Sequence, residues 1–162
     1  MTQKINFIQR ALNEVGYIEG PGVNETKYYL NNVPWCGAFV NWVAKKSKVR
    51  IPNCLFTPAG ANAFKKADRW YPVKTAKPIM GDLAFFDFPA DGIDRISHVG
   101  IVIADNGDGT ILTVEGNTSP DIKGDQRNGG EVCVKVRAYK KTNDRKLPVS
   151  IVGFGRPKFK ER

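Results

Sequence analysis

The sequence predicts an α+β domain, with helices from its first half packed on one face of an antiparallel sheet of about five to six strands from its second half. Two observations support this prediction. Apolar residues recur at helical spacing up to about residue 67, and beyond Pro78 they form short runs divided by turn residues. The length of 162 residues suits one domain and leaves no linker that would divide it, so we expect a single domain over residues 1–162.

Three helices are expected, each with apolar residues three or four positions apart that form a face to bury. The first covers about residues 2–15. The second covers residues 35–46, and its lysines gather at the C-terminal end, where the helix dipole favours cations. The third is marked by Thr57 as its N-cap and Pro58 as its first helical residue.

Five strands follow, each bounded by turn residues. The Asn-Gly-Asp-Gly sequence at 106–109 predicts a hairpin, because Asn and Gly accept the positive φ that such turns require. The expected strands cover residues 82–88, 97–104, 110–116, 131–139 and 149–156.

Composition excludes several classes of protein. An apolar fraction of 41% with 10% aromatic residues predicts a folded core, and three cysteines are too few for a disulfide framework. A single histidine excludes zinc proteases that hold their metal through two or three histidines. No apolar run approaches the roughly 18 residues needed to cross a membrane. The N-terminus also lacks the apolar stretch of a signal peptide, so we expect synthesis in the cytoplasm and any export by another route.

The chain is strongly basic. Lys and Arg number 25 against 16 Asp and Glu, which gives a net charge of +9. This excess favours an anionic partner, such as nucleic acid, a membrane surface or an acidic polymer. The sequence has no helix-turn-helix, zinc-finger or RNA-recognition signature, so a non-catalytic basic module that binds nucleic acid is the weaker alternative.

Cys36 is a candidate nucleophile. It follows Pro34 and Trp35, so we expect it in the first turn of the second helix, where unpaired backbone N–H groups and the positive end of the helix dipole stabilise a thiolate. The same N–H groups can stabilise an oxyanion. Cys54, in the loop before the third helix, and Cys133, within a strand, are interpreted as core residues.

His98 begins a strand and is the one histidine available for acid–base chemistry. A lone histidine in a strand is often structural, but here a candidate nucleophile lies on a preceding helix. Gly100 lies on the same face of the strand, and we expect its missing side chain to leave room beside the imidazole for a helix end.

The next strand ends in Glu115 and Asn117. If the hairpin forms, the polar ends of both strands meet at one edge of the sheet, where Glu115 or Asn117 can accept the ring N–H of His98. Two other acids compete for this role. Asp82 is expected to be a turn residue at a strand entry, and Asp87 is expected to point outward from its strand.

A metal site is not predicted. The three cysteines and His98 are separated by 18, 44 and 35 residues and lack the paired Cys-x-x-Cys spacing of zinc sites. No Asp-rich loop has the spacing of a calcium site, and no other cofactor is expected.

Four segments of the chain form a further pattern: PWCGAFVNW at 34–42, GDLAFF at 81–86, SHVGIV at 97–102 and VEGNT at 114–118. In this order and spacing they resemble the CHAP family, the cysteine, histidine-dependent amidohydrolases/peptidases. The resemblance extends over residues 5–156 and implies a papain-like α+β fold. It also implies hydrolysis of a peptidoglycan amide bond, either as an endopeptidase of the stem peptide or cross-bridge or as an N-acetylmuramoyl-L-alanine amidase.

The resemblance implies a role for each matching residue. Cys36 matches the nucleophile, which forms a thioester intermediate, and His98 matches the general base and then acid. Glu115 matches the residue that orients the histidine, and Asn117 matches a fourth polar residue of the site. Some relatives bind calcium through acidic residues of the loop before the nucleophile, whereas this loop offers only Glu25 and asparagines.

Substrate and setting are also implied. The aromatic residues Trp35 and Tyr28 are candidates for the substrate groove. The net charge suits attraction to anionic wall polymers, and the basic tail at 158–162 would contribute to it. We therefore expect a monomeric peptidoglycan hydrolase without a separate cell-wall-binding domain. It would reach the wall after release from its host, as a phage endolysin does, as part of a virion, or as an exported bacterial enzyme.

Overall fold

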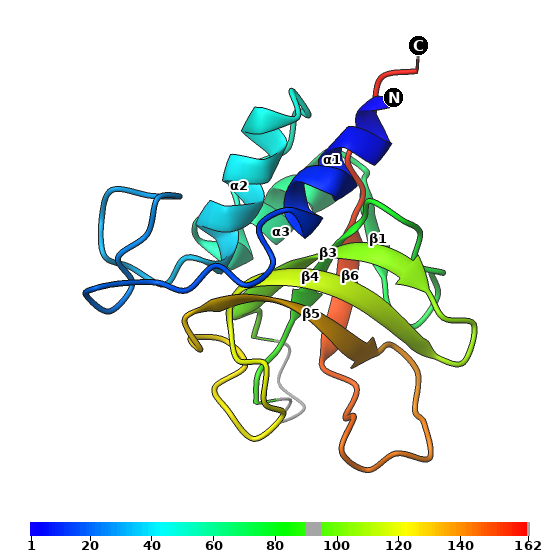
Figure 1. Ribbon diagram of the computed structural model, residues 1–162. Helices are drawn as coiled ribbons and strands as arrows, with labels where there is room; N and C mark the ends of the chain where they lie inside the picture. The colour runs from blue at the N-terminus through cyan, green and yellow to red at the C-terminus, as the bar shows by residue number, and fades with distance from the viewer. Residues whose placement is uncertain (90–94, 162) are drawn as a thin grey trace.

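Three helices cover one face of a six-stranded antiparallel sheet in a computed structural model that describes residues 1–89 and 95–161 (Figure 1). The helices are α1 (Gln3–Leu12), α2 (Cys36–Lys46) and α3 (Thr57–Lys66). The strands are β1 (Trp70–Pro72), β2 (Leu83–Phe86), β3 (His98–Asp105), β4 (Thr110–Thr118), β5 (Glu131–Ala138) and β6 (Ile151–Gly155). The predicted α+β class with a papain-like arrangement is confirmed.

The strand order is β1-β6-β2-β3-β4-β5, so β6 returns from the end of the chain to lie between β1 and β2. The hairpin predicted between β3 and β4 is present, with Gly107 and Gly109 at φ values of 78° and 89°. Strand β1 was not predicted, because three residues that end in Pro72 are too short for any periodicity to be seen. At α3, Thr57 is the first helical residue and Phe56 is the N-cap. Pro58 is tolerated at any position of this first turn, because the backbone N–H groups of a first helical turn have no partner within the helix.

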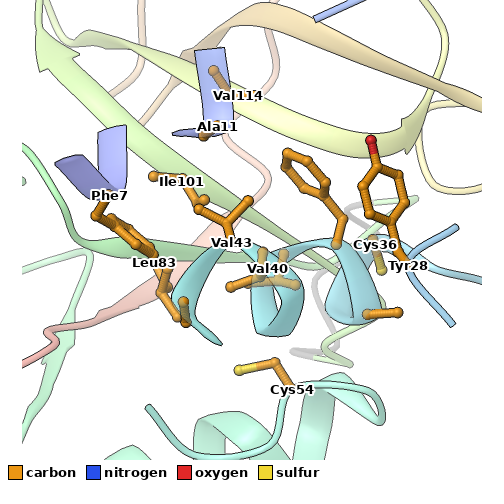
Figure 2. Close-up of a cluster of buried hydrophobic side chains, with 14 of the residues drawn as sticks. Phe7, Ala11, Tyr28, Cys36, Val40, Val43, Cys54, Leu83, Ile101 and Val114 are labelled. Atoms are coloured by element: carbon orange, nitrogen blue, oxygen red, sulfur yellow. The ribbon is translucent and has the colours of Figure 1, made fainter. Parts of the chain in front are cut away.

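Alternating side chains divide the sheet into two apolar layers. The larger core lies between the sheet and the helices, and Figure 2 shows Val43 of α2 close to Ile101 of β3 within it. On the opposite face a smaller cluster includes Phe86, Val102 and Phe154. None of the helices in the described part of the chain is long and apolar enough to span a membrane.

The first turn of α2 is held tightly against the segment before α3. A β-carbon at Gly37 would overlap the carbonyl oxygen of Cys54. The Asn41 side chain accepts a hydrogen bond from the Cys54 N–H at 2.9 Å and donates one to Asn53 at 2.7 Å. Gly37 is therefore required by close backbone contact, and this contact sets the position of Cys36 immediately before it.

Asp82 lies in a turn at the entry to β2 as predicted, whereas Asp87 differs from its prediction. Asp82 is fully buried and forms a two-point ion pair with Arg156, with N–O distances of 2.8 and 2.9 Å. The prediction that Asp87 points outward is wrong, since the residue is only 4% exposed. Apolar clusters cover both faces of the sheet along β2, where all four residues are buried, so alternation gives no exposed face there.

Gly37→Ala should lower the free energy of unfolding by about 1–3 kcal/mol, the usual cost of overpacking a core, because backbone atoms surround the added methyl group. Urea denaturation measures the change. Gly22→Ala is the matched control, because the nearest atom there is a carboxylate oxygen of Glu25 at 2.9 Å on a side chain that can move. Equal stability of the Gly37 variant and the parent protein would contradict the tight packing.

Candidate active site

Cys36, His98 and Glu115 converge where the N-terminal end of α2 meets strands β3 and β4. Cys36 is the first residue of α2, His98 is the first residue of β3, and Glu115 lies on β4. Their exposed fractions are 4%, 0% and 0%. Charge on any of the three is therefore shielded from bulk water and depends on its protein neighbours.

The imidazole of His98 is bound to Glu115. Its Nε2 lies 2.8 Å from Oε1 of the carboxylate. A β-carbon at Gly100 would lie 2.5 Å from Cγ of Glu115, so the missing side chain makes room for this carboxylate from β4. The prediction that Gly100 makes room for a helix end is wrong, because the neighbouring strand fills that face first.

Glu115 is held in turn by Arg137 of β5. The guanidinium donates from Nε to Oε2 at 2.8 Å and from Nη2 to Oε1 at 2.6 Å, and Thr113 donates its hydroxyl to Oε2. Burial alone would raise the pKa of Glu115, but the charge and hydrogen bonds of Arg137, with those of His98, hold it well below its usual range. The carboxylate is therefore ionised and fixed in orientation.

Two phenylalanine rings enclose this ion pair and the imidazole. Phe86 and Phe88 stack on each other, with centroids 5.4 Å apart, and lie 5.6 and 5.7 Å from the His98 ring. The Arg137 guanidinium lies over the same two rings at 5.4 and 5.1 Å, which is cation–π distance. The apolar walls exclude water from the hydrogen bonds and strengthen them.

Cys36 and His98 shift each other's ionisation. Burial raises the pKa of the Cys36 thiol, but the charge and hydrogen bonding of His98, with backbone hydrogen bonds from Val99 and Gly37, lower it overall. Burial lowers the pKa of His98, but the Cys36 charge and hydrogen bond, with those of Glu115, raise it to about 9. The pair thus favours a thiolate beside an imidazolium, which is the reactive form of a cysteine nucleophile.

The second ring nitrogen of His98 remains available for proton transfer. Nδ1 is buried and has no hydrogen-bond partner among the described residues, while Nε2 is bound to Glu115. The β3–β4 ladder begins only at Ile101 and Val114. The first residues of β3 are therefore not paired with β4 and can face the N-terminal end of α2. Catalytic hydrogen bonds in ligand-free enzymes are often long and shorten when substrate binds.

Asn117 does not join this cluster. Its backbone is left-handed, with φ of 59°, its side-chain oxygen accepts from the Gly130 N–H at 3.1 Å, and its amide nitrogen donates to Asn128 at 2.8 Å. Both ends of the side chain therefore hold the loop between β4 and β5. Among the described residues it has no hydrogen bond to Cys36, His98 or Glu115.

Trp35 and Tyr28, predicted to contact substrate, lie in the core instead. Trp35 is fully buried and Tyr28 is 7% exposed, with the two rings stacked at 5.4 Å. The indole N–H of Trp35 donates to Glu19 at 2.7 Å, and the Tyr28 hydroxyl donates to Glu14. These two rings therefore pack in the core and anchor the loop that leads into Cys36.

The other two cysteines are unsuited to chemistry. Both are buried, and burial together with neighbouring negative charge raises the pKa of Cys54 to about 12 and that of Cys133 to about 11. They therefore stay protonated, as their interpretation as core residues requires. The described residues contain no group of three or more Cys, His, Asp or Glu side chains placed to hold a metal ion.

Arg137 is the functional residue that the sequence did not indicate. In β5 the valines at 134 and 136 suggest an inward apolar face, yet each is 43% exposed, whereas Arg137 is 7% exposed. The apolar alternation of this strand thus indicates the wrong face. A different argument would have found Arg137: a buried carboxylate on the neighbouring strand requires a cation within reach.

A reactive thiol at a helix N-terminus, beside a histidine carried by an antiparallel sheet, is the arrangement of papain-like cysteine hydrolases. The model of the CHAP domain family matches residues 28–117, more than half of the chain, and the chain belongs to this family. CHAP proteins are cysteine peptidases and amidases that act on peptidoglycan.

A solved structure from Staphylococcus aureus subsp. aureus Mu50, described as similar to lipoprotein, NLP/P60 family, shares the fold. The TM-score is 0.50 at 17% sequence identity, over 95% of this chain and 41% of that chain. The chain thus spans less than half the length of that protein. None of the curated proteins matches the chain.

Arg137→Leu should lower the free energy of unfolding by about 3–5 kcal/mol at neutral pH, because the buried Glu115 charge loses its guanidinium counterion and two of its hydrogen bonds. The stability that ionised Glu115 contributes is present above its ordinary pKa of 4.5 and is lost as pH falls toward its lowered folded-state pKa. The variant should lose this acid dependence. Denaturation at pH 7 and pH 4 measures both effects, with the exposed Arg127→Leu as control. The prediction fails if the two variants are equally stable at pH 7.

Proposed function

We propose that this chain hydrolyses an amide bond of peptidoglycan through a Cys-His-Glu mechanism. The observation that supports it most is the pairing of a thiol of lowered pKa with a histidine whose far nitrogen is held by an ionised carboxylate. Membership of the CHAP family supports peptidoglycan as the polymer that is cleaved. In this proposal Cys36 and His98 are the catalytic residues, and Glu115 and Arg137 are positioning residues.

The first half of the reaction forms a thioester. The Cys36 thiolate attacks the carbonyl carbon of the scissile amide, and the π electrons of the carbonyl move onto its oxygen. Unpaired N–H groups of the first turn of α2 stabilise this oxyanion. The C–N bond then breaks as the imidazolium of His98 gives its proton to the leaving amine.

The second half releases the acid. A water molecule attacks the thioester carbonyl and gives a proton to the now neutral imidazole, and the C–S bond breaks. The products are the restored thiolate–imidazolium pair and a carboxylic acid, which loses its remaining proton to solvent and leaves as the carboxylate. Throughout, Glu115 retains the hydrogen bond to Nε2, so only Nδ1 exchanges protons with the reacting groups.

The bond cleaved lies in the stem peptide, in the cross-bridge, or between N-acetylmuramic acid and L-alanine. All three are secondary amides and suit the same thiol chemistry. Mass analysis of products from purified walls of defined cross-bridge type separates them, because each cut leaves a different new amine or lactyl terminus.

Cys36→Ser should reduce amine release from purified walls by at least about 1,000-fold, because a hydroxyl is far less acidic than the paired thiol. Cys133→Ser is the matched control and should keep near-normal activity, since this thiol lies across from Glu115 in the β4–β5 pairing but stays protonated, with its pKa raised to about 11 by burial. Unchanged wall cleavage by the Cys36 variant would remove the basis of the catalytic assignment.

The pH profile of kcat/KM on a soluble wall fragment should be bell-shaped. Activity rises through the lowered pKa of Cys36, as the thiolate forms, and falls near about 9, as His98 loses the proton that the leaving amine needs. In Glu115→Gln the alkaline limb should move to lower pH, because the carboxylate raises the pKa of His98. An unmoved alkaline limb would argue against Glu115 as the orienting group.

A further inference from the structure

A basic groove lies away from the active site. It has a volume of about 1170 Å³ and is bounded by the start of α1, the segment after α2 and the C-terminal segment 156–161. Figure 1 shows the two chain ends side by side at this place. Seven of its lining side chains are cationic and two are acidic.

Helix α2 separates the groove from the catalytic thiol. Cys36 begins α2, whereas Lys48 and Arg50 follow its C-terminal end and line the groove. A helix of 11 residues is about 16 Å long, so the groove is roughly that far from the site of reaction. A ligand held there leaves the active site free.

The walls of the groove are tied together by specific contacts. The Gln3 side chain donates to the Lys48 carbonyl and accepts from the Lys160 N–H, both at 2.6 Å. Arg69 donates to the carbonyl oxygens of residues 156 and 157 at 2.5 and 3.1 Å. Phe159 packs on Phe7, with ring centroids 5.7 Å apart. The C-terminal segment is therefore fixed against the body of the protein, and the groove is present before any ligand binds.

Six of the seven cations of the groove have no acidic partner among the described residues, and one of them, Arg69, donates instead to backbone carbonyl oxygens. One acidic lining residue, Asp82, is taken by Arg156 at 2.8 Å. Apart from Arg69, four lysines and one arginine remain, and they form no ion pair with the described residues. They are Lys4, Lys48, Arg50, Lys158 and Lys160. Helix α1 also begins here without an acid in its first turn, so its dipole adds to the positive potential.

The aromatic content of the groove distinguishes between polyanions. Single-stranded nucleic acids are held by free aromatic rings on which the bases stack. Phe159 is the one aromatic lining residue, and its ring already contacts Phe7 and, at 5.3 Å, the Lys4 ammonium. The groove thus offers charge without a stacking platform, which suits a chain of phosphates without bases.

We propose that this groove binds a phosphodiester polymer of the bacterial wall, of the polyol-phosphate (teichoic acid) class. The choice of a wall polymer rests on the proposed function, whereas the anionic phosphate chemistry rests on the groove itself. Binding here holds the enzyme at the wall while α2 keeps the thiol free for the peptide part of the same wall. The groove therefore lowers KM for intact walls and leaves kcat on soluble fragments unchanged.

The test uses two triple variants in a Cys36→Ser background, which binds but does not cleave. Lys48→Gln, Arg50→Gln and Lys158→Gln neutralise the groove, and all three side chains are exposed. The control variant replaces Lys141, Arg145 and Lys146 by Gln in the exposed segment between β5 and β6. Each variant loses two lysines and one arginine, so the two have equal net charge.

Binding is measured to poly(glycerol phosphate) and to walls before and after chemical removal of their phosphate polymer. The groove variant should bind both the polymer and intact walls at least about tenfold more weakly. The slope of log affinity against log salt concentration should fall by about three, one for each cation removed. The control variant should change affinity less than about twofold, and walls stripped of phosphate should bind both variants and the parent equally.

Equal weakening by the two triple variants would overturn the proposal, because net charge alone would then explain binding. Single-stranded DNA that competes as well as the wall polymer would overturn the choice of ligand. With Cys36 intact, the groove variant should cleave soluble wall fragments at the parental kcat. Since binding is measured without catalysis, failure of the proposed hydrolase function and failure of the groove are distinguishable.

Discussion

An ionised carboxylate buried inside the protein is the constraint on which the candidate site depends. Three neighbouring strands each contribute one side chain to a hydrogen-bonded chain of charged groups. They are His98 from β3, Glu115 from β4 and Arg137 from β5. A carboxylate without bulk water around it requires both neutralisation and hydrogen bonds. Arg137 and Thr113 provide these, and one oxygen of Glu115 also lies beside the ring of His98.

In the proposed mechanism, this constraint also fixes which ring nitrogen of His98 exchanges protons. Because Nε2 of His98 is held by Glu115, the tautomer and ring orientation are determined before substrate arrives. The ring therefore presents Nδ1 at the open start of β3, next to the N-terminal end of α2. The position of that end depends on Gly37 and the Cys54 segment, so the packing of α2 and the ion pair in the sheet jointly define the site.

The sequence predicts those parts that depend on local pattern. The change of periodicity near Pro78, the 106–109 turn and the position of Cys36 at a helix start were all visible, and the hairpin placed Glu115 near His98. Interactions between distant segments were not visible. Arg137 lies inward only because Glu115 needs it, and Asp87 follows a strand that is covered on both faces by apolar clusters. Trp35 and Tyr28 are aromatic residues near the nucleophile, but their surroundings make them core residues.

Strand β5 forms an edge of the sheet, and such edges expose backbone groups to which strands of other molecules can add. Here that strand carries Arg137 and Lys135 on its inner face, and the Lys135 ammonium donates to the carbonyl oxygen of Ser119 at 2.6 Å. Inward-pointing charges are a recognised protection against edge-to-edge aggregation, because an added strand would have to bury them further. The cation that holds Glu115 in place thus also disfavours the addition of a further strand at this edge.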